Sequence, residues 1–160
     1  MDLPKRKSNR LENYDYNSAG AYFITVCTKN RQNLLCDIVG EGLCALPSIK
    51  LFPIGLVIKE SIEYINKKYI GVSINKYVIM PNHIHLLVRI KTETGGHRVP
   101  PLQSIIGNFK SYTTHKYGGV LWQRSFYDHI VRNENEYNKI WEYIDQNPLK
   151  WENDELFPSK

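Results

Sequence analysis

Two histidines separated by one residue lie in the apolar segment YVIMPNHIHLLVRI, residues 77–90. Side chains two positions apart on a β-strand point to the same face, so His83 and His85 would project together, with Ile84 on the opposite face. Neutral imidazole is a common ligand of divalent metals. The pair could therefore share one cation, with a third ligand from elsewhere in the chain. The alternative is two surface histidines on a solvated strand face. The spacing alone favours that alternative, but the apolar flanks and the tight turn at Pro81-Asn82 leave both interpretations open.

A tyrosine and an asparagine near the C-terminal end have a second suggestive spacing. Tyr143 and Asn147 are four residues apart and would share one face of a helix. Tyr143 could act as a nucleophile and Asn147 as an amide-oxygen ligand. Both also have structural alternatives: Tyr143 borders the apolar stripe of Ile140 and Ile144, and Asn147 directly precedes Pro148. From spacing alone, these structural roles are favoured.

The elements that would position these residues follow from hydrophobic periodicity and from the placement of glycine and proline. Strands are predicted at 21–28, 71–80, 83–91 and 120–132, and helices at 53–69, 102–117 and 133–148. Residues 29–53 are predicted to form a long irregular connection. The order indicates an α+β protein with a ferredoxin-like βαββαβ antiparallel sheet and an additional C-terminal helix that carries the tyrosine. In that topology the strand with the histidine pair is central.

Length and composition are typical of one globular domain, 1–160, in which 1–10 would be a flexible basic tail. Cys27, Cys36 and Cys44 form an odd set without CxxC spacing, which argues against a disulfide framework or a zinc knuckle and favours a reduced, cytoplasmic setting. No apolar run reaches the roughly 18 residues of a membrane span, so no membrane partner is expected. The net charge of +5 is compatible with a polyanionic partner.

Three segments, YVIMPNHIHLL, LWQRSFYDHIVRNENEY and YIDQNPLKW, occur in this order and together resemble the REP-associated tyrosine transposases. That family belongs to the HUH single-tyrosine transposases of bacterial insertion sequences. The segments YDYNSAGAYFITVCTKNRQ and GGHRVPPLQSIIGNFKSYT are also similar to it. The resemblance extends from about residue 10 to residue 152, and MPNHIHLL is its most specific motif.

The resemblance implies a metal-dependent single-stranded DNA nuclease and strand-transferase. His83 and His85 stand where the family binds Mg²⁺ or Mn²⁺, and Asn147 matches the third ligand, with Gln146 as the alternative if the helix register differs. Tyr143 stands at the position of the family's nucleophilic tyrosine. In the family, that tyrosine attacks a phosphodiester, forms a 5′-phosphotyrosine link and releases a 3′-hydroxyl.

The implied partner is single-stranded DNA, with a hairpin expected, bound by a monomer or a homodimer in the bacterial cytoplasm in association with the nucleoid. Basic and aromatic residues are the candidates for contacts with phosphates and bases. They are Lys29, Arg31, Lys110, Trp122, Arg124 and Arg132.

Two other functions use the same residues differently. The first is a catalytically idle nucleic-acid-binding module on the same fold, which would bind DNA without a covalent product. The second is an unrelated small metal-dependent hydrolase, in which Tyr143 would have no role. The presence of both histidines, the tyrosine and the asparagine favours the transposase over the idle module, and the extent of the resemblance disfavours the hydrolase.

Overall fold

A computed structural model describes residues 19–40, 46–91, 96 and 98–158, so the basic tail predicted at 1–10 lies outside the described residues. The principal elements are β1 Gly20–Cys27, α1 Pro53–Lys68, β4 Val72–Ile79, β5 His83–Ile90, α2 Leu102–Tyr117, β6 Tyr127–Val131 and α3 Glu134–Gln146. Among the described residues, no helix is long and apolar enough to span a membrane.

Strands β1, β4, β5 and β6 form one antiparallel sheet in the order β4-β5-β1-β6. This order and the βαββαβ succession confirm the ferredoxin-like prediction. The histidine strand β5 lies in the interior of the sheet between β4 and β1, as expected. Its register against β1 places Thr25 opposite His85 and Cys27 opposite His83.

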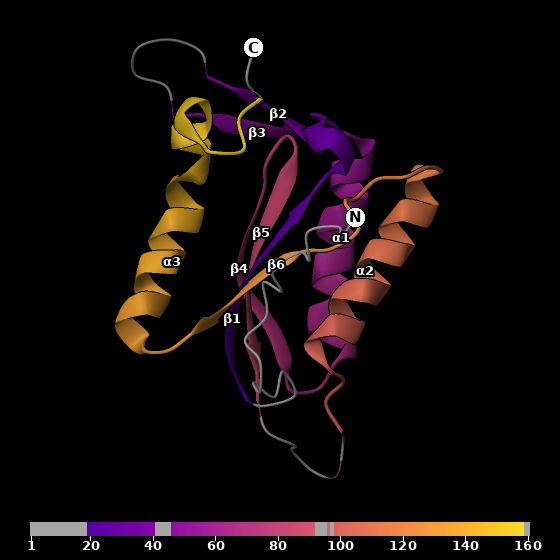
Figure 1. Cartoon of the computed structure of the whole chain (residues 1–160), viewed down its shortest axis with the longest axis vertical. Helices are drawn as coiled ribbons and strands as arrows, with labels where there is room; N and C mark the ends of the chain where they lie inside the picture. The colour runs from indigo at the N-terminus through magenta and orange to yellow at the C-terminus, as the bar shows by residue number, and fades with distance from the viewer. Residues whose placement is uncertain (1–18, 41–45, 92–95, 97, 159–160) are drawn as a thin grey trace, which may run out of the picture.

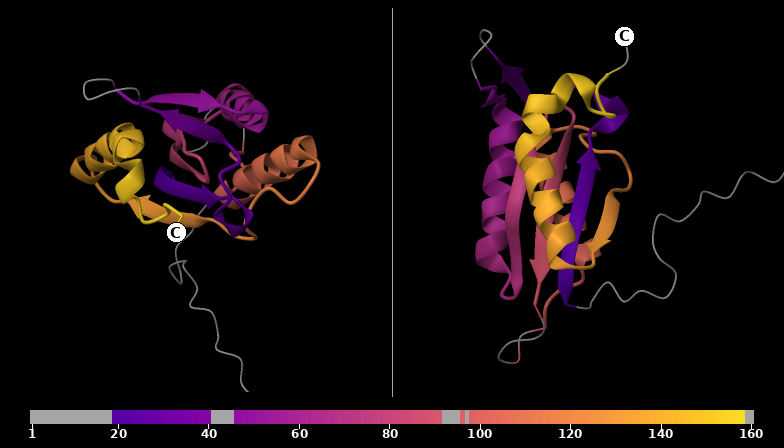
Figure 2. Two further views of the ribbon diagram at one scale, coloured as in Figure 1. Left: turned by 90° about the horizontal axis from the view of Figure 1, so that it is seen from above. Right: turned by 90° about the vertical axis from the view of Figure 1, so that its left-hand side faces the viewer.

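The sheet is covered on both faces (Figures 1 and 2). Helices α1 and α2 cover one face and bury the main core, to which β1 and β5 contribute alternate side chains such as Ile24 and Leu86. Helix α3 covers the opposite face over a smaller core that includes Leu87 and Ile144. Because alternate residues of a strand point to opposite faces, His83 and His85 point toward α3 and Ile84 points into the main core.

The connection predicted to be irregular at 29–53 contains regular structure, so that prediction was wrong. A short helix, η1 Lys29–Arg31, is followed by a two-stranded antiparallel hairpin of β2 Cys36–Val39 and β3 Ser48–Leu51. The strands are only four residues long and half-buried, with Ile38 and Ile49 packed against the smaller core. Such short runs give too few alternations for a period to be detected.

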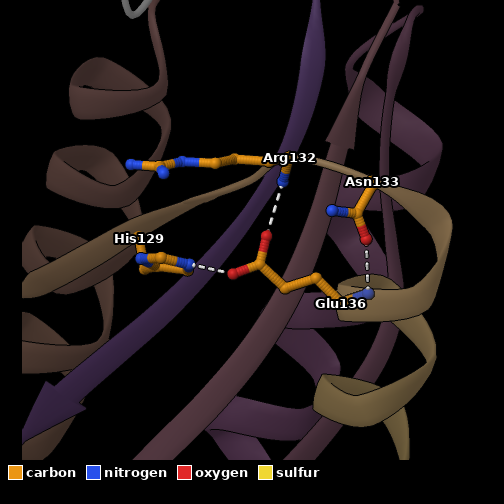
Figure 3. A network of polar contacts seen from close by, with 4 residues as sticks. All are labelled: His129, Arg132, Asn133 and Glu136. Atoms are coloured by element: carbon orange, nitrogen blue, oxygen red, sulfur yellow. Dashed lines mark hydrogen bonds and ion pairs between the residues drawn. The ribbon is translucent and has the colours of Figure 1, made fainter.

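The first turn of helix α3 is fixed by a network of polar contacts (Figure 3). Asn133 caps the helix, its Oδ1 accepting a hydrogen bond from the Glu136 backbone N–H at 2.8 Å. The Glu136 carboxylate reaches back to the Arg132 backbone N–H and to His129 Nε2, each at 2.7 Å. These contacts connect the first turn of α3 to the end of β6.

Candidate active site

The two histidines lie side by side beneath the C-terminal part of the chain. Their ring centroids are 4.6 Å apart, and their side chains are 0% and 3% exposed for His83 and His85. The prediction that they share one face of a strand is confirmed. The alternative of two surface histidines is wrong, because side chains of α3 and of the short helix that follows it, η2 Asn147–Asn153, lie against them. The ring centroid of Trp151 is 5.9 Å from that of His83, and that of Tyr143 is 5.4 Å from that of His85.

Each histidine is held through Nδ1. The amide nitrogen of Asn82 donates to the backbone carbonyls of Leu156 and Arg31, at 2.7 and 3.3 Å, so its Oδ1 faces His83 Nδ1 at 2.7 Å. An amide oxygen only accepts, and His83 Nδ1 therefore carries the proton, which leaves an electron lone pair on Nε2. His85 Nδ1 lies 2.8 Å from the Thr25 hydroxyl. Both Nε2 atoms are buried without a hydrogen-bond partner, the arrangement of an imidazole prepared to bind a metal.

Asn147 supplies a third ligand atom to the same place. Its side chain is 2% exposed, and its Oδ1 is likewise buried without a hydrogen-bond partner. Its Nδ2 donates to Asp154 Oδ2 at 3.0 Å, which directs the oxygen away from Asp154. Gln146, the alternative, is exposed and accepts a hydrogen bond from Lys150 at 2.8 Å. The geometry therefore supports Asn147.

Asp154 was not found by sequence reasoning. One carboxylate oxygen of Asp154 and one ring nitrogen of each histidine, His83 and His85, all lie within 4.8 Å of one another. Asp154 follows η2, which turns the chain back over β5. The sequence offers only a short acidic stretch, ENDE at 152–155, and no spacing distinguishes one of its members. Asn82 was likewise not singled out as a site residue by sequence reasoning.

The electrostatics keep the imidazoles in the form that binds metals. Burial lowers the pKa of His83 to about 4, although the Asp154 carboxylate opposes the shift. Burial, together with the neighbouring His83, places the pKa of His85 well below its usual value. Both rings are therefore neutral at pH 7. Two imidazoles with amide and carboxylate oxygens suit a borderline-to-hard divalent ion such as Mn²⁺ or Mg²⁺.

Tyr143 lies at the rim of this group. Its ring centroid is 5.4 Å from that of His85 and 6.0 Å from that of Phe23, and its side chain is 46% exposed. Burial of part of the ring and the Asp154 carboxylate raise the pKa of Tyr143, while a hydrogen bond with Asn147 acts in the opposite sense. The hydroxyl is thus protonated at pH 7 and close to a candidate metal ligand.

Two other helical tyrosines, Tyr137 on α3 and Tyr112 on α2, lie away from the histidines. Tyr137 is 9% exposed in the smaller core, and its hydroxyl accepts a hydrogen bond from Asn75 at 2.8 Å. Tyr112 is on α2, which covers the opposite face of the sheet. Of the three, Tyr143 alone is beside the histidines.

A cavity of about 580 Å³ opens beside the tyrosine, lined by His85, Tyr143, Asp154 and the aromatic residues Phe126 and Tyr127, among others. Among the six predicted DNA contacts, Arg31 alone lines it. Arg31 and the preceding Asn30 have φ values of 54° and 56°. Positive φ is sparsely populated by residues other than glycine and is concentrated at functional sites.

The other five predicted DNA contacts lie outside this cavity. The Lys110 ammonium donates to the backbone carbonyls of Gln123, Arg124 and Ser125, at 2.7 to 3.3 Å, and burial lowers its pKa. Trp122 is 5% exposed, and its indole N–H donates to Thr113 at 2.8 Å. Both side chains thus have their polar groups engaged within the protein. Lys29, Arg124 and Arg132 are exposed.

Comparison with known proteins finds relatives that align with nearly the whole chain. A Haemophilus influenzae protein named only as uncharacterised is 35% identical over 173 residues, covering 95% of this chain and 93% of that protein. A second H. influenzae protein, described provisionally as a REP-associated tyrosine transposase, is 23% identical over 154 residues, covering 88% of this chain and 77% of that protein.

The same fold is found in a solved structure of a REP-associated tyrosine transposase bound to a REP hairpin. It matches with a TM-score of 0.63 and 23% identity, over 89% of this chain and 74% of that chain. The family of IS200-like transposases matches residues 16–147. The family resemblance of the sequence motifs is thereby confirmed, and this chain belongs to the IS200-like transposases.

Proposed function

We propose that this protein is a metal-dependent single-stranded DNA nuclease and strand-transferase that acts through a covalent 5′-phosphotyrosine at Tyr143. One observation carries the proposal. Three buried ligand atoms without hydrogen-bond partners, Nε2 of His83, Nε2 of His85 and Oδ1 of Asn147, converge beside a half-exposed tyrosine. Buried polar atoms are normally paired, so three unpaired ligand atoms in one place support a bound cation as their shared partner. An idle binding module would have no need of them.

The chain's own residues can perform the cleavage step. The Tyr143 oxygen attacks the phosphorus, a new O–P bond forms, and the bond to the 3′-oxygen breaks. The phenol proton passes to solvent in the open cavity, and the departing 3′-oxygen takes up a proton to become a hydroxyl. A Mg²⁺ or Mn²⁺ ion held by His83, His85 and Asn147 would supply polarisation of a phosphoryl oxygen. Rejoining to another 3′-hydroxyl reverses these bond changes and needs no nucleotide cofactor.

The substrate proposal rests on the cavity and on the family. Arg31 can contact a phosphate, and Phe126 and Tyr127 provide aromatic surfaces for unstacked bases. The solved relative is bound to a REP hairpin. We therefore infer a single-stranded substrate that contains a hairpin.

The test is formation of a covalent adduct. The protein is incubated with Mn²⁺ and a pool of single-stranded DNA hairpins with randomised flanks, labelled 3′ to the randomised segment, and then run on a denaturing gel. Wild type should give a slow-migrating protein–DNA band, and Tyr143→Phe should give none. Tyr127→Phe is the matched control, since Tyr127 lines the same cavity, and should keep the band. A band that persists in Tyr143→Phe contradicts the proposal.

A further inference from the structure

The segment that follows α3 returns to the histidine pair and is fixed there by several contacts. The Leu156 carbonyl accepts a hydrogen bond from Asn82 Nδ2 at 2.7 Å, and the Trp151 ring lies against His83 at an interplanar angle of 41°, with ring centroids 5.9 Å apart. The Leu156 backbone N–H donates to Asp154 Oδ1 at 2.7 Å. These contacts hold the Asp154 carboxylate over the imidazoles.

We propose that Asp154 is a direct fourth ligand of the metal, supplied by the C-terminal segment. This inference rests on the metal site of the proposed function and extends it to a residue beyond the tyrosine helix. Its carboxylate already lies within 4.8 Å of a ring nitrogen of His83 and of His85. In addition, its Oδ2 accepts the hydrogen bond that directs the Asn147 oxygen inward.

Charge gives the physical reason for a fourth ligand of this kind. The other three ligand atoms belong to neutral groups, and a dication in a buried site is strongly disfavoured without negative charge nearby. Among the described residues, Asp154 is the acidic member of the group that could hold a metal with the two histidines. A carboxylate also makes the ligand set harder, which favours Mn²⁺ and Mg²⁺ over softer ions.

A second role for Asp154 must be separated from ligation. The carboxylate could act only as the outer partner that orients Asn147. The substitution Asp154→Asn distinguishes the two roles, because an asparagine oxygen can still accept the Asn147 hydrogen bond but carries no charge. If Asp154 only orients Asn147, the asparagine variant retains metal affinity. If Asp154 is a ligand, it does not.

The experiment measures Mn²⁺ binding to the DNA-free protein by the loss of the free-ion electron paramagnetic resonance signal. It compares wild type with Asp154→Asn, Asp154→Ala, Glu155→Gln and His85→Ala, each first checked for a cooperative thermal transition. We expect Asp154→Asn and Asp154→Ala each to weaken Mn²⁺ binding by about tenfold or more. The exposed neighbour Glu155, which lines the same cavity, is the matched control and should bind as wild type does.

The outcomes separate this inference from the proposed function. Unchanged affinity in Asp154→Asn with loss of binding in His85→Ala overturns the inference and leaves the metal site in place. Unchanged affinity in both variants removes the metal site itself. Should Asp154→Asn not fold, Asp154→Glu and Asp154→Ala decide the matter, since a ligand role requires the glutamate to bind Mn²⁺ more tightly than the alanine does.

Discussion

The Asn82 side chain makes hydrogen bonds to three parts of the candidate active site. It fixes His83 through Nδ1 and also anchors the backbone of Arg31 and Leu156. Outer partners of this kind set the tautomer and direction of a ligand, and their loss typically lowers metal affinity by about 10- to 100-fold. We expect this loss for Asn82→Ala, measured by Mn²⁺ titration. Asn75→Ala, which removes a hydrogen bond to Tyr137 away from the site, is the control and should leave affinity unchanged.

The buried imidazoles also give the metal-free protein a defined pH dependence. The pKa of His83 is lowered to about 4 in the folded state, below its ordinary value of 6.5, and that of His85 is lowered as well. Between pH 6.5 and pH 4 the two histidines are therefore protonated more in the unfolded chain than in the folded chain. Their contribution to stability is fully present above pH 6.5 and is lost as the pH falls toward 4.

Urea denaturation of the protein in a chelator checks this expectation. The free energy of unfolding should fall between pH 7 and pH 5 in wild type, and less steeply in His85→Gln. His115→Gln, a substitution at an exposed position, should leave the change of the unfolding free energy with pH as it is in wild type. Equal slopes in wild type and His85→Gln would contradict the assignment of the pH dependence to the buried pair.

At the scale of the elements, the start of α3 determines where the tyrosine is presented. Asn133 caps the helix, and Glu136 connects it to β6. Replacing a capping asparagine with alanine typically costs about 1 kcal/mol of stability. We expect Asn133→Ala to lower the free energy of unfolding by about that amount in chemical denaturation. Asn153→Ala, a substitution at an exposed position at the end of η2, is the comparison and should cost less.

Local patterns were sufficient to predict most of these elements. The alternation in the strands and the apolar spacing of α1 and α2 indicated the ferredoxin-like order, because these segments are long enough to show a period. The hairpin of β2 and β3 was missed, since each strand has only four residues. The burial of His83 was missed for another reason, as it depends on η2 folding back over β5.

The same distinction applies to the site. The His83 and His85 pair and the spacing of Tyr143 and Asn147 are local, so strand and helix periodicity could suggest them. Asp154 comes to the histidines only through the tertiary path of the chain after α3. No regular spacing connects Asp154 to either histidine, so it could not be chosen from the sequence.

For the whole molecule, the net charge of +5 and the cavity at Arg31 predict electrostatic binding of single-stranded DNA. Because binding to phosphates releases counterions, log affinity should fall linearly with log salt concentration. Fluorescence anisotropy across a salt series should show tighter binding of a hairpin-bearing single strand than of a blunt duplex. Arg31→Ala should weaken binding and reduce the slope of log affinity against log salt concentration. Arg98→Ala, a substitution at an exposed position outside the cavity lining, should leave both the affinity and the slope unchanged. Equal affinity for blunt duplex, or no salt dependence, would count against this partner.

The central claim is that Tyr143 becomes covalently joined to DNA, and peptide mapping tests it most directly. Trypsin is expected to release residues 140–150, IWEYIDQNPLK, in which Tyr143 is the single tyrosine, whereas Tyr137 lies in the preceding peptide, 133–139. The adduct formed with Mn²⁺ is digested with trypsin and nuclease and analysed by tandem mass spectrometry. We predict that the 140–150 peptide carries a nucleotide mass at Tyr143. A nucleotide on any other peptide, or none on a wild-type protein that binds Mn²⁺ and cleaves the strand, would contradict the account.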